Sequence, residues 1–138
     1  ELGCKVMLIT DGDVAPVVAA QIENIDIDIL FGIGAAAEGV LAACSAKCMG
    51  GDFQGKLHPR NDEEIKRCKE MGIKDPENHI YTIDEMVNTD KVIFCFTGVT
   101  KGYLVDEVKR DKNKIITQSI LLNSFEKKVR KINTEHIL

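Results

Sequence analysis

The stretch Leu8-Ile9-Thr10-Asp11-Gly12-Asp13 decides the fold together with a second one, Gly32-Ile33-Gly34-Ala35-Ala36-Ala37-Glu38-Gly39-Val40. In each, an apolar run of strand type ends in small residues and carboxylates, and a helix follows directly. In an open α/β sheet, ligands bind outside the carboxyl ends of the strands, where helix N-termini direct backbone N–H groups outward. The two corners are therefore predicted to place Asp11, Asp13 and Glu38 around one phosphorylated, metal-dependent substrate.

Strands and helices are expected to alternate outward from these corners. The patterns predict strands over 5–10, 25–31, 52–58 and 91–96, helices over 14–22, 35–48, 63–71 and 83–87, and a brief helix or turn over 103–108. Two closing strands, 115–122 and 128–132, are expected to form a hairpin, followed by a tail that holds His136. The alternation predicts right-handed βαβ units on a mostly parallel sheet with an antiparallel edge, and a single α/β domain over 1–138.

Composition limits the function classes. The chain is 44% hydrophobic and 29% charged, as in a soluble globular protein. A net charge of −4 and a pI near 5.4 argue against nucleic-acid binding, which usually needs a basic face. No basic-then-apolar leader and no apolar run of about 18 residues is present, so neither secretion nor a membrane span is indicated. The five cysteines form no CxxC pair and are expected to be reduced thiols of a cytoplasmic protein.

The acidic residues of the two corners have two interpretations each. Asp11 and Asp13 flank a glycine and could bind sugar hydroxyls or a hard divalent cation, or one of them could cap the following helix. Glu38 could ligate Mg²⁺ or Mn²⁺ bridging a phosphate, or simply provide a favourable charge in the first turn of its helix. Residue types and spacing leave both alternatives open.

Other motifs are weaker. Gly32-x-Gly34-x-x-Ala37 matches the alanine variant of a dinucleotide-binding turn, but no acidic residue ends a second strand about 20 residues later. The segment Thr97-Gly98-Val99-Thr100 could contact phosphate or only turn the chain. No Cys–His or Ser–His arrangement is a candidate for nucleophilic catalysis, and His58 and His79 are expected to be structural or solvated.

At these residues the chain resembles the carboxyl-terminal half of class II fructose-1,6-bisphosphatases, including the bifunctional sedoheptulose-bisphosphatase forms. The matching segments are LITDGDV (8–14), GIGAAAEGVLAA (32–43), KCMGGDFQGKL (47–57) and VIFCFTGVTKGYL (92–104). They follow the order and approximate spacing of that family. The resemblance implies a three-layer α/β/α arrangement like the carboxyl-terminal half of the inositol-monophosphatase-like sugar phosphatases.

The same resemblance implies an activity and a set of site residues. The expected reaction is hydrolysis of the 1-phosphate of fructose 1,6-bisphosphate, a step of gluconeogenesis, with Mn²⁺ or Mg²⁺ as cofactor. Substrate binding carries over to Asp11, Gly12, Asp13 and Ala35, and a metal ligand to Glu38. No catalytic residue is expected within this chain, which begins at Glu1 and lacks the family's amino-terminal half.

Two residues that differ from the family's pattern, and the family's amino-terminal half, which is not part of this sequence, bear on the expected activity. Ala35 stands where the family's corner usually has glycine, and Gln118 stands where the family has arginine in a Thr-Arg-Ser segment. The rival interpretation is therefore a non-catalytic, phosphosugar-binding or regulatory relative. Because one carboxylate cannot hold a catalytic metal cluster, we expect the chain alone to fold without turnover unless it meets the missing half. An apolar face left uncovered could promote a homo-oligomer.

Overall fold

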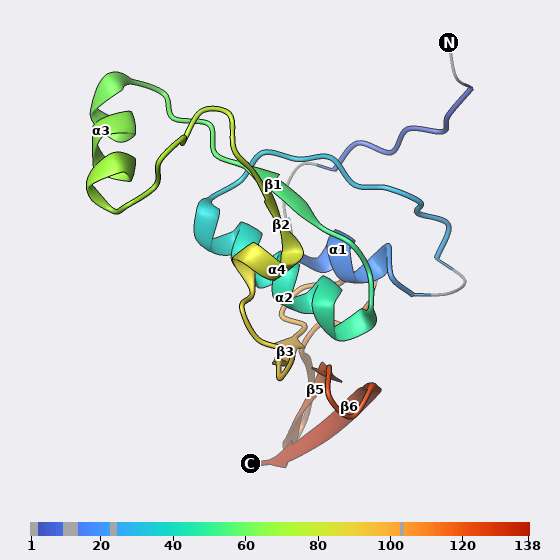
Figure 1. The fold of residues 1–138 in the computed structure, drawn as a ribbon. Helices are drawn as coiled ribbons and strands as arrows, with labels where there is room; N and C mark the ends of the chain where they lie inside the picture. Colours follow the sequence, from blue (N-terminus) through green and yellow to red (C-terminus); the bar gives the residue numbers. More distant parts are fainter. Residues whose placement is uncertain (1–2, 10–13, 23–24, 103) are drawn as a thin grey trace.

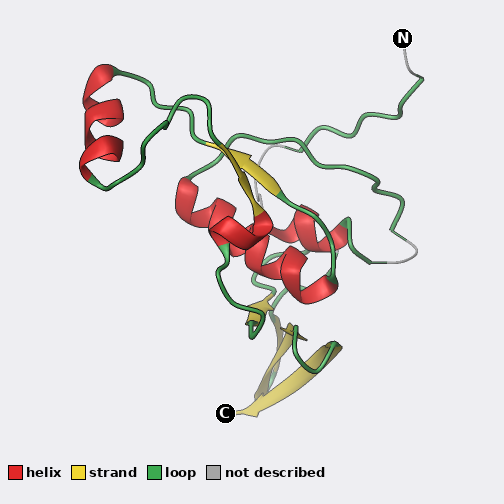
Figure 2. Cartoon of the chain, in the orientation of Figure 1, coloured by secondary structure: helices red, strands yellow, loops and turns green. Residues whose placement is uncertain are grey.

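The computed structural model describes residues 3–9, 14–22, 25–102 and 104–138. It is an α/β structure (Figure 1), with helices and strands in separate colours in Figure 2. The helices are α1 (Val14–Ala19), α2 (Ala36–Met49), α3 (Asp62–Glu70) and α4 (Ile83–Met86). The strands are β1 (Gln54–Lys56), β2 (Ile80–Thr82), β3 (Ile93–Thr97), β4 (Lys109–Asp111), β5 (Lys114–Asn123) and β6 (Lys128–Ile137). Among the described residues, no helix is long and apolar enough to cross a bilayer.

Helix α2 is the centre of the fold. Its alanine-rich sequence favours the helix, and its small buried side chains, Ala42, Ala43 and Ala46, allow neighbouring elements to approach closely. It contacts α1, α4, β3 and β5. Gly50 ends it with φ 76°, a left-handed conformation in which its N–H reaches the carbonyls of the last turn. The helix predicted over 35–48 is confirmed.

The carboxyl-terminal sheet is antiparallel. Strand β5 pairs with β3 and β4 along one edge and with β6 along the other, with Leu122 opposite both Phe94 and Val129. Leu122 and Ile120 are buried against the α1 side of the core. The predicted hairpin is confirmed, but β6 runs five residues further than expected and includes His136, so the expected tail is wrong. Within the range 103–108, expected to be a brief helix or turn, residue 103 lies outside the described residues and the chain bends at 104–105. It then continues into β4, which the apolar pattern did not predict.

The two amino-terminal strands are not formed by the described residues. Residues 3–9 and 25–35 belong to neither a helix nor a strand (Figure 1). Several of their apolar side chains are exposed, with Leu8 at 90%, Phe31 at 85% and Ile33 at 89% of their accessible area, whereas Ile25, Ile27 and Leu30 pack partly buried against the core. A strand requires a neighbour for its backbone N–H and C=O groups, and no described segment supplies one. The expected mostly parallel sheet is corrected accordingly, since every described strand pair is antiparallel.

The middle of the chain forms an arm around a short β1–β2 ladder. Strand β1 covers only the centre of the predicted strand 52–58. Helix α3 begins where predicted because the Asn61 side chain accepts a hydrogen bond from the Glu64 N–H at 2.9 Å. Thr82 and Glu85 form a reciprocal capping box at the start of α4. The two caps fix where α3 and α4 begin, on each side of the arm.

Candidate functional site

The second corner of the sequence forms the amino-terminal end of α2. Ala35 is the N-cap residue, with φ −70° and ψ 146°, and its carbonyl accepts a hydrogen bond from Gly39 N–H at 3.0 Å. The methyl side chain of Ala35 offers no capping acceptor. The first-turn N–H groups are therefore left without a side-chain cap, as an anion-binding helix end requires. Both Ala35 and Glu38 are exposed.

Glu38 lies in the first turn of α2 and points to no described partner. No hydrogen bond or ion pair joins its carboxylate to any residue in the described ranges. It therefore does not close a capping box with the N-cap residue, in contrast to Glu85 in α4. The favourable charge near the helix dipole remains, but its carboxylate oxygens are available for a ligand.

The first corner falls outside the described residues. Asp11, Gly12 and Asp13, which carry the predicted substrate contacts, belong to residues 10–13 that the structure does not describe. The helices that follow the two corners do pack together. Val17 of α1 shares a buried cluster with Ala42 and Ala46 of α2. The structure thus joins the helices of the two corners, while the relation of Asp11 and Asp13 to Glu38 stays a prediction.

The donor set for a metal is incomplete in the described part of the chain. Within those residues, no group of three or more His, Cys, Asp or Glu side chains is arranged to hold an ion. Glu38 is a hard oxygen donor of the type that Mg²⁺ and Mn²⁺ prefer, but such ions take about six ligands. The chemistry of Glu38 therefore suits one metal ligand, and the described residues add no further cluster around it.

The Thr97–Thr100 corner has a structural explanation. Gly98 is buried, and its N–H donates to the carbonyl of Gln118 at 3.0 Å. A Cβ atom at Gly98 would lie 2.1 Å from the carbonyl oxygen of Asp106. The backbone of the 104–108 loop thus occupies the space that a larger side chain would need. Close backbone packing accounts for the small residue here without a phosphate.

Gln118, where the resemblance led us to expect an arginine, has two partners in the structure. Its Nε2 donates to Asn133 Oδ1 on β6 at 2.8 Å, and its Oε1 accepts from Asp106 N–H at 2.9 Å. A neutral amide can do both because it carries a donor and an acceptor. An arginine has no acceptor for the Asp106 N–H. In this chain Gln118 ties β5, β6 and the preceding loop together.

Sequence reasoning missed Lys47 as a residue of structural importance. Its side chain is only 13% exposed, and its Nζ donates to Asp84 Oδ1 at 2.9 Å and to the Val87 carbonyl at 2.8 Å. Hydrogen bonding to Asp84 raises the pKa of Lys47 despite its partial desolvation. No local sequence signal reveals this junction, because its partners lie about 40 positions further along the chain.

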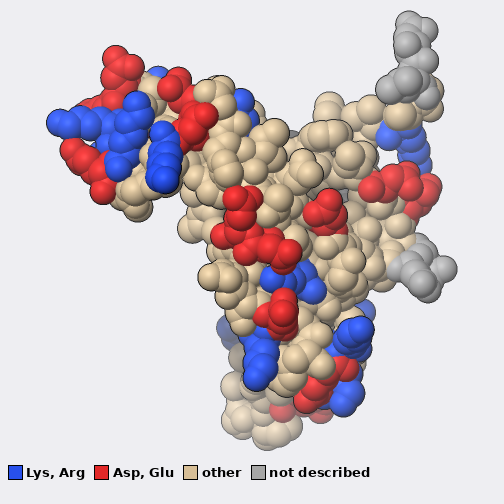
Figure 3. Space-filling model, in the orientation of Figure 1, with Lys and Arg blue, Asp and Glu red and all other residues tan. Residues whose placement is uncertain are grey.

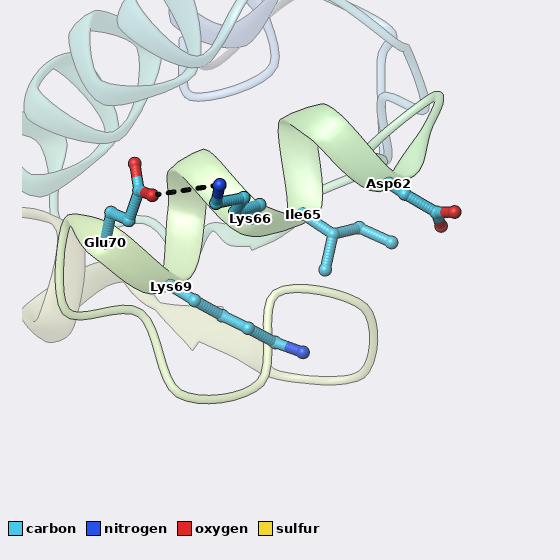
Figure 4. Close-up of a pocket in the computed structure, with 5 residues that line it drawn as sticks. All are labelled: Asp62, Ile65, Lys66, Lys69 and Glu70. Carbon is cyan, nitrogen blue, oxygen red and sulfur yellow. Dashed lines mark ion pairs between the residues drawn. The ribbon is translucent and has the colours of Figure 1, made fainter.

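The surface of α3 has a shallow groove of about 580 Å³. Figure 4 shows the side chains that line it, all from α3, with Lys66 and Glu70 3.8 Å apart as an exposed ion pair. Acidic and basic side chains alternate on this helix, visible at the upper left of Figure 3. Neither Ala35 nor Glu38 contributes to the groove, and its lining has the character of a solvated helix face.

Comparison with known proteins identifies the family. The model of bacterial, glpX-encoded fructose-1,6-bisphosphatase matches residues 1–136. The chain is 37% identical to fructose-1,6-bisphosphatase class 2 of Haemophilus influenzae, over 99% of this chain and 44% of that protein. It is 34% identical to fructose-1,6-bisphosphatase 1 class 2 of Escherichia coli, over 100% of this chain and 44% of that protein.

A third relative carries a bifunctional name. The D-fructose 1,6-bisphosphatase class 2/sedoheptulose 1,7-bisphosphatase of Trichodesmium erythraeum is 34% identical, over 99% of this chain and 43% of that protein. The chain thus spans less than half the length of these curated relatives. The match covers nearly every residue of the chain, including the segments around both corners. The chain belongs to the class 2, glpX-type fructose-1,6-bisphosphatase family.

Proposed function

We propose that the chain supplies the carboxyl-terminal part of a metal-dependent sugar-bisphosphate phosphatase that removes the 1-phosphate of fructose 1,6-bisphosphate. The observation that carries the proposal is the family match over 1–136, in which the corner with Glu38 is included. The curated relatives are named for fructose 1,6-bisphosphate, and one also for sedoheptulose 1,7-bisphosphate. The proposed setting is gluconeogenesis in the cytoplasm.

Within the chain, we assign substrate contacts to Asp11, Gly12, Asp13 and Ala35, and one metal ligand to Glu38. The uncapped amino-terminal end of α2 supports the assignment at Ala35, since an anionic oxygen can accept hydrogen bonds from its N–H groups. The partner-free carboxylate of Glu38 supports the second. Bound Mn²⁺ or Mg²⁺ would neutralise charge on the phosphoryl oxygens and activate a water.

The remaining metal ligands and the catalytic groups are proposed to come from the portion of the relatives that this chain does not span. The exposed apolar side chains of Leu8, Phe31 and Ile33 support this, because apolar side chains in extended chain suit strands of a larger sheet. In that assembly, residues 1–138 would act as one α/β domain with the three-layer arrangement expected for the family. The domain by itself is proposed to fold but not to hydrolyse substrate.

The test is Mn²⁺-dependent phosphate release from fructose 1,6-bisphosphate by the full-length protein that carries this sequence. Glu38→Gln is compared with Glu63→Gln, which makes the same change in the exposed first turn of α3. Both variants lose a similar helix-dipole contribution of a few tenths to about 1 kcal/mol. We expect activity to collapse in Glu38→Gln only, with partial recovery at high Mn²⁺.

The outcomes separate the candidate functions. Activity that survives Glu38→Gln would keep the phosphatase but remove Glu38 from the metal site. A folded full-length protein that binds fructose 1,6-bisphosphate without releasing phosphate would support the binding or regulatory alternative. Saturable binding of a nicotinamide nucleotide, with no response to the sugar bisphosphate, would contradict both.

A further inference from the structure

We propose that the outer edge of β6 pairs antiparallel with the same edge of a second copy of this chain, centred on Asn133. The proposal concerns an interface, and it does not depend on the catalytic assignment. Strand β6 is ten residues long and pairs only with β5 among the described strands. Its outer N–H and C=O groups therefore offer an open template for another strand.

The outer edge is accessible and carries apolar side chains. In Figure 1 the β5–β6 hairpin projects away from the helices, with the carboxyl terminus at its far end. Val129 is 53% exposed and Ile137 is 77% exposed, although both lie in a regular strand. The strand contains no proline, which would otherwise block a further ladder.

One face of β6 has a self-complementary sequence. Side chains alternate between faces, so the register with β5 places Val129, Lys131, Asn133, Glu135 and Ile137 on the face of the buried Ile120 and Leu122. Read in the opposite direction, this series is apolar, acidic, amide, basic and apolar. A strand with that pattern matches an antiparallel copy of itself in charge and in polarity.

The symmetry selects the register. Directly opposed side chains of an antiparallel pair lie on the same face of the sheet. In a pair related by a two-fold axis perpendicular to the sheet, one residue must therefore lie opposite its own copy. With Asn133 on the axis, Lys131 faces Glu135 of the second copy and Val129 faces its Ile137. Centring on Lys131 instead opposes two lysines, and centring on Glu135 opposes two glutamates. Centring on Ile132 or Thr134 leaves Glu135 opposite Val129 or Asn133.

The polar contacts already present extend across this axis. Gln118 Nε2 donates to Asn133 Oδ1, so the Asn133 amide keeps its own N–H donors for the second copy. Glu135 bonds Lys114 on β5 at 2.8 Å, and Lys131 belongs to none of the described ion pairs. Pairing would place the Glu135 carboxylate of the second copy opposite Lys131. It would also align the Gln118–Asn133 hydrogen bonds of the two copies in one row across four strands.

The arrangement also avoids a collision between the two bodies. The buried contacts of the sheet with the helices lie at Ile120 and Leu122, beside the beginning of β6. In the antiparallel pair, the beginning of one β6 lies beside the end of the other. The two helical bodies would therefore lie about six residues apart along the sheet, roughly 20 Å at the usual strand rise.

The test measures self-association of the protein by sedimentation velocity. Hydrogen exchange of the β6 backbone amides reports whether the outer edge of β6 becomes hydrogen-bonded. We expect a concentration-dependent dimer in which alternate backbone amides of β6 gain protection. In a Lys131→Glu homodimer, a carboxylate faces a carboxylate at both 131–135 pairs. In a Glu135→Lys homodimer, an ammonium group faces an ammonium group at both pairs. Each variant alone should weaken the dimer by about tenfold or more.

The decisive measurement mixes the two variants. In a Lys131→Glu/Glu135→Lys heterodimer, both cross-axis pairs are again opposite in charge, so the mixture should recover the dimer that each variant loses. Lys74→Glu makes the same charge change at an exposed position outside β6 and should dimerise normally. Circular dichroism confirms that each variant is folded.

Two results would overturn the proposal. One is a monomer at every concentration with uniform exchange along β6. The other is a dimer that Lys131→Glu and Glu135→Lys leave unchanged, because association would then use another surface, such as the exposed segments 3–9 and 25–35. Failure to recover dimer in the mixture, with both variants folded, would exclude the proposed register.

Discussion

Lys47 and Asp84 lie 37 positions apart in the sequence, and their side chains meet at 2.9 Å. Lys47 is in the last turn of α2 and Asp84 in the first turn of α4. The same ammonium group also donates to the Val87 carbonyl, which ends α4. This junction joins the central helix to the arm that carries β1, β2 and α3.

Replacing Lys47 by Met should lower the thermal midpoint more than replacing Asp84 by Asn. The Lys47 side chain is 13% exposed and its ammonium group has a carbonyl partner as well, whereas the Asp84 side chain is 80% exposed and can regain water. Lys66→Met on α3 is the matched control, because Lys66 is 77% exposed and should be almost neutral. Differential scanning fluorimetry of the three variants checks the order. Equal effects of Lys47→Met and Lys66→Met would contradict a junction at Lys47.

Gly98→Ala should destabilise the fold by about 2–3 kcal/mol, in the range of overpacked interiors. The added Cβ would meet the Asp106 carbonyl oxygen at 2.1 Å and Val105 Cγ2 at 2.9 Å. Gly102→Ala serves as control in the same loop, since its Cβ would lie 3.6 Å from the nearest atom. Urea unfolding midpoints of both variants give the comparison. A Gly98→Ala protein as stable as Gly102→Ala would show that the 104–108 loop can shift freely.

Gln118→Leu should cost about 1–2 kcal/mol, because it removes two hydrogen bonds and leaves the Asp106 N–H without its acceptor. Gln118→Glu should cost less, since a carboxylate still accepts from that N–H. Urea unfolding measures both, and exchange of the Asp106 amide locates the effect. Both variants lose the donor to Asn133, so a Gln118→Glu protein less stable than Gln118→Leu would contradict a stabilising role for the bond from the Asp106 N–H.

The capping box of α4 predicts a pH-dependent contribution to stability. The Thr82 backbone N–H, with help from its hydroxyl and from His79, lowers the pKa of Glu85. Because the folded pKa lies below the unfolded value of about 4.3, this contribution is present above that pH and is lost as the pH falls through the folded pKa. Wild type should therefore be more stable than Glu85→Gln at neutral pH, with the difference vanishing in acid. Urea unfolding across the acid range measures it, and a constant difference would contradict the assignment.

The thiols of α2 should be slow to react. Burial raises the pKa of both Cys44 and Cys48, and Cys48 Sγ donates to the Val92 carbonyl at 3.6 Å. Cys95 is exposed on β3. We expect Cys95 to be alkylated about tenfold or more faster than either at mildly alkaline pH. Mass spectrometry of peptides from a time course provides the rates, and the same course in urea should bring the three rates together.

The sequence by itself determined the local elements and the family. An alanine-rich run ended by Gly50 specifies α2, Asn61 and Thr82 specify the starts of α3 and α4, and apolar runs specify β3 and β5, because caps and periodicity act within a few residues. The corner motifs around Gly12 and Glu38 pointed to the family that the comparison identified.

Only the tertiary structure decided which of the apolar runs pair as strands and which partners Lys47, Gly98 and Gln118 contact. The runs 5–9 and 25–31 have strand patterns, yet a strand exists only where a neighbour supplies hydrogen bonds, and the described chain supplies none. The roles of Lys47, Gly98 and Gln118 depend on partners 8 to 40 positions away, so no local pattern could reveal them. Short-range interactions encoded in the sequence thus determined the individual helices and strands, and long-range contacts determined which of them pack or pair together.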